Sequence, residues 1–143
     1  MDIRQITEKY SVSPQIDPED VAAIAAAGFT RLICNRPDVE VPPSHQSDAI
    51  KAAAEAAGLD FAVLELTHQT MSPDIATSQR QLIETAPGPV LAYCASGTRC
   101  SVIWAIAQAA TMPTDDILAA TAAAGYNLEN LRAGLEQLRA SAG

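Results

Sequence analysis

The chain has 143 residues, of which 48% are hydrophobic, so it is long enough to bury a core without metals or disulfides. Its formal net charge of −8 argues against nucleic acids and anionic membranes as general partners, because neither attracts an acidic surface. The 3 cysteines are too few for a disulfide framework, and the 2 histidines have no zinc-ligand spacing.

The chain also lacks any sign of a membrane segment or of internal division. No apolar run approaches the roughly 20 residues that span a bilayer, and the N-terminus has no signal-peptide core. No linker or low-complexity stretch interrupts the sequence. We therefore expect one domain over residues 1–143, without a membrane segment, in the cytoplasm, where thiols stay reduced.

Short apolar runs alternate with helical patterns along the chain. Asp17 is typical of an N-cap, and Pro18 behind it begins a helix that ends near Gly28. There follow a strand at 29–34, a helix over 44–58, a strand at 59–66, a helix from 72, a strand at 89–94, a nearly all-apolar helix over 99–110, and helices over 114–124 and 128–141. Strands separated by helices predict βαβ units, and hence an α/β fold with a mostly parallel sheet.

The stretch "LAYCASGTRCS" (91–101) carries the most specific chemical signal. Cys94 ends a strand, and a helix begins near Thr98, so the backbone N–H groups between them converge on one point that binds anions. Gly97 supplies the backbone freedom for the turn, and Arg99 offers a planar fork to the anion. The same field lowers the pKa of a cysteine thiol. The predicted site comprises Cys94 and Arg99 as catalytic residues, with Ala95, Ser96, Gly97 and Thr98 as the anion-binding loop. The alternative is a buried cysteine at an ordinary βα corner.

Two motifs, "NRPD" (35–38) and "CASGTR" (94–99), make the sequence similar to a known family. With the pattern around them, over roughly residues 12 to 132, the chain resembles the phosphatase-like domain family of beta-lactamase-hydrolase-like proteins. The resemblance implies the dual-specificity (cysteine) phosphatase fold, a three-layer structure whose central sheet is flanked by helices. Some relatives are fused to a metallo-hydrolase or a persulfide dioxygenase, which implies such an enzyme as a partner. Members are labelled either phosphatase or sulfurtransferase.

The spacing of the loop favours one of these reactions. Cysteine phosphatases carry C-x₅-R, whereas this chain has C-x₄-R, the count of rhodanese-type sulfurtransferases. The sequence therefore predicts a sulfurtransferase: Cys94 takes sulfur from a small-molecule donor, holds it as a persulfide, and passes it to a thiol acceptor, without a cofactor. One alternative is a phosphatase that acts on a phosphate ester through a phosphocysteine. Another is a non-catalytic thiol redox or anion-binding module that uses Cys94 and Cys100.

A phosphatase also needs a proton donor for its leaving group. His68 lies in the loop after the strand at 59–66, although a solvent-facing histidine is the plainer interpretation. Asp38 is a rival, just past the end of the strand at 29–34. Arg36, beyond the same strand, either adds positive charge to the site or forms a surface ion pair with Asp38.

Cys100 departs from the usual pattern, in which a serine or threonine follows the arginine of the loop. A thiol is a weaker hydrogen-bond donor than a hydroxyl, and Ser101 is a substitute if the helix register allows. Cys100 would alternatively resolve an oxidised Cys94 as a disulfide. The third interpretation is a small apolar side chain that fills space beneath the loop.

Overall fold

A five-stranded sheet forms the centre of the computed structural model, which describes residues 1–142. The strands are β1 (Arg4–Gln5), β2 (Tyr10–Ser13), β3 (Arg31–Cys34), β4 (Asp60–Val63) and β5 (Val90–Tyr93), in the order β1-β2-β5-β3-β4. β1 pairs antiparallel with β2, and every other pair is parallel. The predicted mostly parallel sheet is confirmed.

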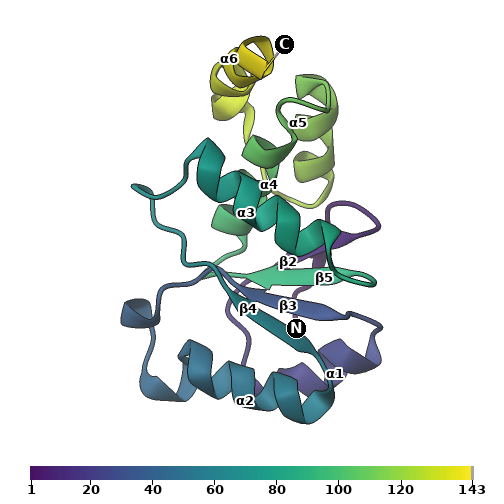
Figure 1. Ribbon diagram of the computed structural model, residues 1–143, viewed down its shortest axis with the longest axis vertical. Coiled ribbons are helices and arrows are strands. Elements are labelled where there is room, and N and C mark those ends of the chain that lie inside the picture. Colours follow the sequence, from purple (N-terminus) through teal and green to yellow (C-terminus); the bar gives the residue numbers. More distant parts are fainter. Residues whose placement is uncertain (143) are drawn as a thin grey trace.

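Helices cover both faces of this sheet (Figure 1). They are α1 (Val21–Ala26), α2 (Ser47–Ala57), α3 (Pro73–Glu84), α4 (Thr98–Gln108), α5 (Thr114–Ala123) and α6 (Arg132–Ala142). α1 and α2 lie on one face, α3 and α4 lie on the other, and α5 and α6 pack outside α4. Among residues 1–142, no helix combines the length and the apolar character needed to cross a membrane.

The central strand β5 divides the core between the two faces. Leu91 and Tyr93 point into the cluster under α1 and α2, whereas Val90, Ala92 and Cys94 belong to the cluster under α4. All of these side chains are buried, as the continuous apolar run of the sequence predicted. The thiol of Cys94 therefore projects from the sheet toward α4.

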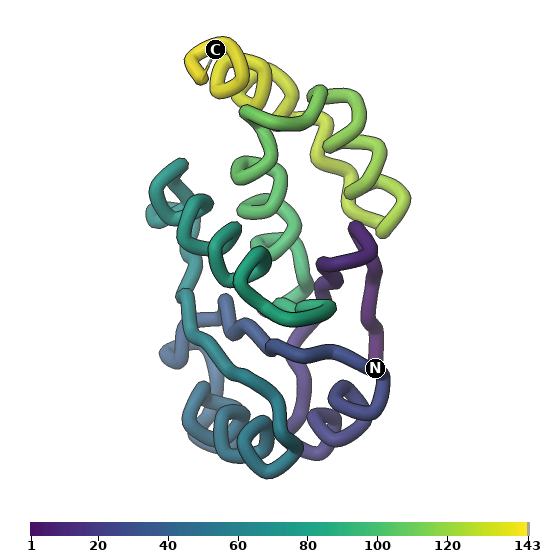
Figure 2. The backbone as a smooth tube through the Cα atoms, turned by 45° about the vertical axis from the view of Figure 1, so that its right-hand side comes forward, coloured from purple at the N-terminus to yellow at the C-terminus, as the bar shows by residue number. Residues whose placement is uncertain are grey.

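The two N-terminal strands were not anticipated from the sequence. β2 (Tyr-Ser-Val-Ser) alternates apolar and polar residues over only four positions, and β1 has only two residues, so both are too short to give a clear strand signal. In Figure 2 the N-terminal segment rises beside the end of α5, where Arg4 donates a hydrogen bond to the carbonyl of Ala124 at 3.1 Å. The predicted first helix is also shorter, because Pro18–Asp20 forms a 3₁₀ turn before α1.

The parallel strands bring three loops to one edge of the sheet. In the register of β3, Cys34 lies opposite Val63 on one side and Tyr93 on the other. The segments that follow β3, β4 and β5 therefore leave the sheet side by side. This carboxyl edge is where open α/β sheets bind ligands.

Candidate active site

The loop between β5 and α4 has the shape that the sequence predicted. Gly97, the residue before α4, has a φ of 91°, a left-handed conformation that side chains other than glycine rarely adopt. A Cβ atom there would also collide with the hydroxyl of Tyr126. That hydroxyl donates to the carbonyl of Ser96 at 3.0 Å. Tyr126, which the sequence analysis did not single out, therefore braces the loop from the segment after α5.

The remaining loop residues line the surface above the thiol. Ala95, Ser96 and Thr98 are exposed, whereas Cys94 is fully buried beneath them. The hydroxyl of Ser96 donates to the hydroxyl of Thr98 at 2.9 Å. The loop thus directs backbone N–H groups toward the sulfur and carries two exposed hydroxyls, an arrangement suited to a small anion.

Cys94 is held as a thiolate by the donors around it. The thiol of Cys100 is the strongest of these, and the backbone N–H groups of Cys100, Gly97 and Ser96 add to it, against the opposing effect of burial. The N–H of Gly97 lies 3.1 Å from the Cys94 sulfur. Together these hydrogen bonds lower the pKa of the Cys94 thiol to about 5. At neutral pH the sulfur is therefore largely ionised, the form in which a cysteine can react as a nucleophile.

Cys100 takes the donor role for which the sequence analysis considered Ser101. Burial, and then the neighbouring Cys94, raise the pKa of the Cys100 thiol well above its ordinary value, so Cys100 keeps its proton. Ser101 is not a second donor to the thiolate, because its hydroxyl donates to the carbonyl of Gly97 at 2.8 Å. Ser101 lies one position further along α4, and its side chain faces back along the helix.

Arg99 lies at the site, but a carboxylate occupies its fork. Its two terminal nitrogens donate to the two carboxylate oxygens of Glu40 at 2.8 and 2.7 Å. One of them also donates to the carbonyl of Leu66 at 2.9 Å. This contact with Arg99 is the main cause that lowers the pKa of Glu40. An anion in the loop would share the guanidinium with Glu40 or displace it.

Arg36 joins the same carboxylate, so the ion pair with Asp38, one of the two alternatives for Arg36, does not form. Arg36 Nε donates to Glu40 at 3.2 Å, with the four-residue spacing of a local ion pair. Asp38 instead accepts from the backbone N–H of Ser47 at 2.7 Å and from its hydroxyl at 3.0 Å. Its carboxylate thus caps the start of α2. The sequence gives no sign that Glu40 belongs to the site, because its spacing indicates only a local pair with Arg36 and not the contact with Arg99.

His68 is exposed on the loop after β4, beside a cavity of about 370 Å³. Arg99 lines the same cavity, together with the apolar side chains of Met71 and Leu128. His68 therefore lies near the anion loop, whereas the carboxylate of Asp38 is engaged at α2. Of the two predicted proton donors, the structure leaves His68 as the better candidate.

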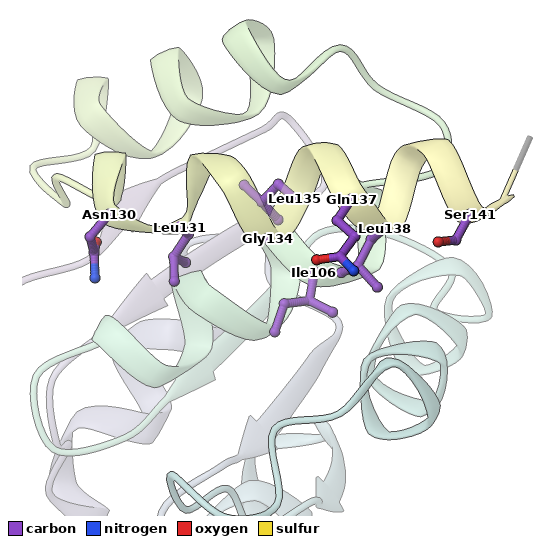
Figure 3. A pocket seen from close by; sticks show the side chains of 8 residues that line it. All are labelled: Ile106, Asn130, Leu131, Gly134, Leu135, Gln137, Leu138 and Ser141. Carbon is purple, nitrogen blue, oxygen red and sulfur yellow. The ribbon is translucent and has the colours of Figure 1, made fainter.

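A second cavity, of about 500 Å³, shares Asn130 and Leu131 with the first and extends along α6 (Figure 3). α6 lines it with Leu135 and Leu138, and Ile106 faces it from α4. None of the loop residues 94–99 lines it, so we do not assign it to the site. Over residues 1–142, no cluster of three or more His, Cys, Asp or Glu side chains is arranged to hold a metal ion.

Comparison with known proteins identifies the family. The model of the phosphatase-like domain of beta-lactamase hydrolase-like protein matches residues 2–111. The chain belongs to this family. A curated family relative, the beta-lactamase hydrolase-like protein of Xylella fastidiosa (strain 9a5c), is 32% identical over 140 residues, which are 96% of this chain and 32% of that protein. The chain thus spans about a third or less of the length of the curated relatives it matches.

Solved structures support the same family and fold. A protein from Neisseria meningitidis Z2491, described as a candidate phosphatase, is 40% identical, with 97% of this chain and 99% of that chain covered and a TM-score of 0.86. A variant of P. aeruginosa TpbA in complex with pTyr shares the fold at 13% identity, with coverage of 99% and 90% and a TM-score of 0.69. The matching family model and the Neisseria structure are both described in terms of a phosphatase, and the comparisons give no support to the predicted sulfurtransferase activity.

Proposed function

We propose that the protein is a cysteine-dependent phosphatase that hydrolyses phosphomonoesters through a phosphocysteine at Cys94. The observation that carries this proposal is a low-pKa thiolate beneath a loop of backbone N–H groups, in a family of phosphatase-like domains. The reaction would take place in the cytoplasm, where thiols stay reduced. A metallo-hydrolase or persulfide dioxygenase partner remains a prediction.

In the first step the Cys94 thiolate attacks phosphorus, and the bond from phosphorus to the ester oxygen breaks. The N–H groups of residues 95–99 and the Arg99 guanidinium stabilise the charge on the three equatorial oxygens. His68 gives a proton to the departing oxygen. In the second step water attacks phosphorus and gives a proton back to His68, the bond from phosphorus to sulfur breaks, inorganic phosphate leaves, and the Cys94 thiolate is restored.

Glu40 has a defined place in this scheme. Before substrate binds, its carboxylate holds the guanidinium groups of Arg99 and Arg36 in place. A phosphate group that enters the loop brings its own negative charge to Arg99, and it would share the guanidinium with Glu40 or displace that carboxylate. Before substrate binds, Glu40 thus compensates part of the positive charge of Arg36 and Arg99 and keeps both side chains ordered.

Sulfur transfer is the second candidate, and one observation favours it. Four residues separate Cys94 from Arg99, one fewer than in cysteine phosphatases, so one amide fewer is available to a phosphoryl group. In that reaction the Cys94 thiolate would attack a sulfane sulfur, and the donor's leaving anion, such as sulfite, would depart without a proton. A persulfide at Cys94 would remain.

Mass spectrometry after incubation with each substrate distinguishes the two reactions. We expect p-nitrophenyl phosphate to give phosphate release and a transient phosphoryl adduct on Cys94, and Cys94→Ser to give neither. Thiosulfate should leave the mass of the protein unchanged. A gain of one sulfur atom that requires Cys94 and is removed by cyanide, without phosphate release, would overturn the phosphatase proposal in favour of sulfur transfer.

A further inference from the structure

A chain of buried polar side chains runs beneath the anion loop. Asn35 comes from the loop after β3, Gln79 from the middle of α3, and Tyr10 from β2, and each is at most 1% exposed. Asn35 begins the "NRPD" motif, and the reaction scheme gives Asn35 itself no role. Burying polar groups is costly unless they are hydrogen-bonded, so a complete network at this place calls for an explanation.

Every link of the network is a short hydrogen bond. The amides of Asn35 and Gln79 pair reciprocally: Asn35 Nδ2 donates to Gln79 at 3.0 Å, and Gln79 Nε2 donates to Asn35 at 2.8 Å. Gln79 Nε2 also donates to the hydroxyl of Tyr10 at 3.2 Å. That hydroxyl donates in turn to the carbonyl of Cys100 at 2.8 Å. One end of the network therefore lies on the first turns of α4.

This end reaches the residue that holds the nucleophile. The thiol of Cys100 is the strongest donor to the Cys94 sulfur. A hydrogen bond from Tyr10 to the Cys100 carbonyl fixes the backbone from which this thiol projects. A small displacement of that backbone would move the N–H and the thiol of Cys100 relative to the Cys94 sulfur, and hydrogen bonds weaken steeply when they lose alignment.

Asn35, at the other end of the network, is connected through the backbone to Arg99. The backbone N–H of Asn35 donates to the carbonyl of Tyr93, the residue before Cys94, at 2.9 Å. Its side chain donates to the carbonyl of Leu64 at 2.8 Å, and its own carbonyl accepts from the N–H of Leu66 at 2.9 Å. The carbonyl of Leu66 is the backbone group that accepts from Arg99. Asn35 thus ties the support of the arginine to the strand that carries the thiol.

We propose that Asn35, Gln79 and Tyr10 are positioning residues, which set the placement of Cys100 and Arg99 around the Cys94 thiolate. Apolar side chains of similar size would fill the same space, but they would not select one position of α4 against the loops after β3 and β4. The proposal rests on the proposed function only in requiring Cys94 as a nucleophile. Phosphoryl transfer and sulfur transfer share that requirement.

Tyr10 offers the cleanest test, since the ionisable groups facing Cys94 are few. They are Cys100 and Arg99 from α4, Tyr10 from β2, and Tyr126 from the segment after α5. Burial raises the pKa of Tyr10 well above its ordinary value, so its hydroxyl stays protonated and donates. Tyr10→Phe removes this donor without changing any charge near the sulfur.

The experiment compares Tyr10→Phe with Tyr93→Phe. Tyr93 is equally buried, but its hydroxyl faces Cys34 on the other side of the sheet. The readout is the rate of Cys94 alkylation by iodoacetamide against pH, followed on the Cys94 peptide by mass spectrometry. We expect Tyr10→Phe to raise the apparent pKa of Cys94 by about one unit, the scale of one hydrogen bond to a charged group, and Tyr93→Phe to leave it unchanged.

Gln79→Met is the second variant, because it keeps the length of the side chain and removes its hydrogen bonds. It should shift the alkylation profile in the same direction as Tyr10→Phe. The proposal is overturned if both variants lower the melting temperature but leave the profile at its wild-type position. It is also overturned if Tyr10→Phe and Tyr93→Phe shift the profile equally. If the variants shift the alkylation profile but the wild-type protein releases no phosphate, the phosphatase function is refuted and the positioning role stands.

Discussion

Two neighbouring buried cysteines have opposite protonation states in this protein, because hydrogen-bond donors surround only one of them, Cys94. Cys94 receives hydrogen bonds from the backbone N–H groups and from the Cys100 thiol, and they lower its pKa to about 5. Burial and the adjacent Cys94 sulfur raise the pKa of Cys100. Burial alone would raise both values, so hydrogen bonding to the charged form is what separates them.

Removal of the Cys100 thiol should therefore weaken Cys94 as a nucleophile at acidic pH. We expect Cys100→Ala to raise the pKa of Cys94 by about one unit or more, because the strongest donor to the thiolate is lost. Alkylation at pH 5 to 6 should slow, whereas at pH 8 the sulfur stays ionised and the rate should hold. Cys100→Ser keeps a donor and serves as the control. An unchanged profile in Cys100→Ala would show that the backbone N–H groups hold the thiolate by themselves.

At the scale of elements, the segment between β3 and α2 makes contacts with both Arg99 and the start of α2. Arg36 and Glu40 turn toward the anion loop, whereas Asp38 between them turns toward α2 and caps its first residue, Ser47. Capping satisfies a backbone N–H that has no partner within the helix. A single short segment thus orders the arginines of the site and the start of a helix.

Asp38 and His68 should respond differently to the same substitution. Asp38→Asn keeps an oxygen for the α2 cap, so we expect little change in stability or in phosphate release, whereas Asp38→Ala should cost about 1 kcal/mol of stability.

His68→Asn should slow hydrolysis of an alkyl phosphate more than that of p-nitrophenyl phosphate, whose leaving group needs no proton. Steady-state rates and thermal unfolding check both. A folded Asp38→Asn protein with the substrate dependence expected of His68→Asn would make Asp38 the proton donor.

At the scale of the whole molecule, the parallel sheet gathers the site from distant parts of an acidic chain. Three loops meet at the carboxyl ends of β3, β4 and β5, and Glu40 joins its neighbour Arg36 to Arg99, which lies 59 positions after Glu40 in the sequence. Because these contacts exist only in the folded chain, a ligand that binds them adds its binding free energy to the stability of the fold.

Inorganic phosphate should consequently stabilise the protein against heat. At about a hundredfold excess over its Kd it adds about 2.7 kcal/mol to the free energy of unfolding, which raises the melting temperature. Arg99→Ala should remove most of this increase, and sodium chloride at equal ionic strength is the control for screening. Equal increases with phosphate in the wild-type protein and in Arg99→Ala would show that the anion binds elsewhere.

Local patterns in the sequence determined most of the fold and the nucleophile. Continuous apolar runs, helix-capping residues and the glycine before α4 act over a few residues, so the strands β3 to β5, the main helices and the loop at 94–99 follow from short stretches of chain. The same logic failed for β1 and β2, which are short and partly polar and are ordered by their neighbours in the sheet.

Only the tertiary structure decided which side chains complete the site. Glu40 on Arg99, Tyr126 on Ser96, and the network of Asn35, Gln79 and Tyr10 all join segments far apart in the chain. No spacing rule predicts such contacts, because they depend on how the whole chain folds and not on the number of residues between the partners. The sequence thus determined where the thiolate lies, and the packing of the sheet, helices and loops determined what surrounds it.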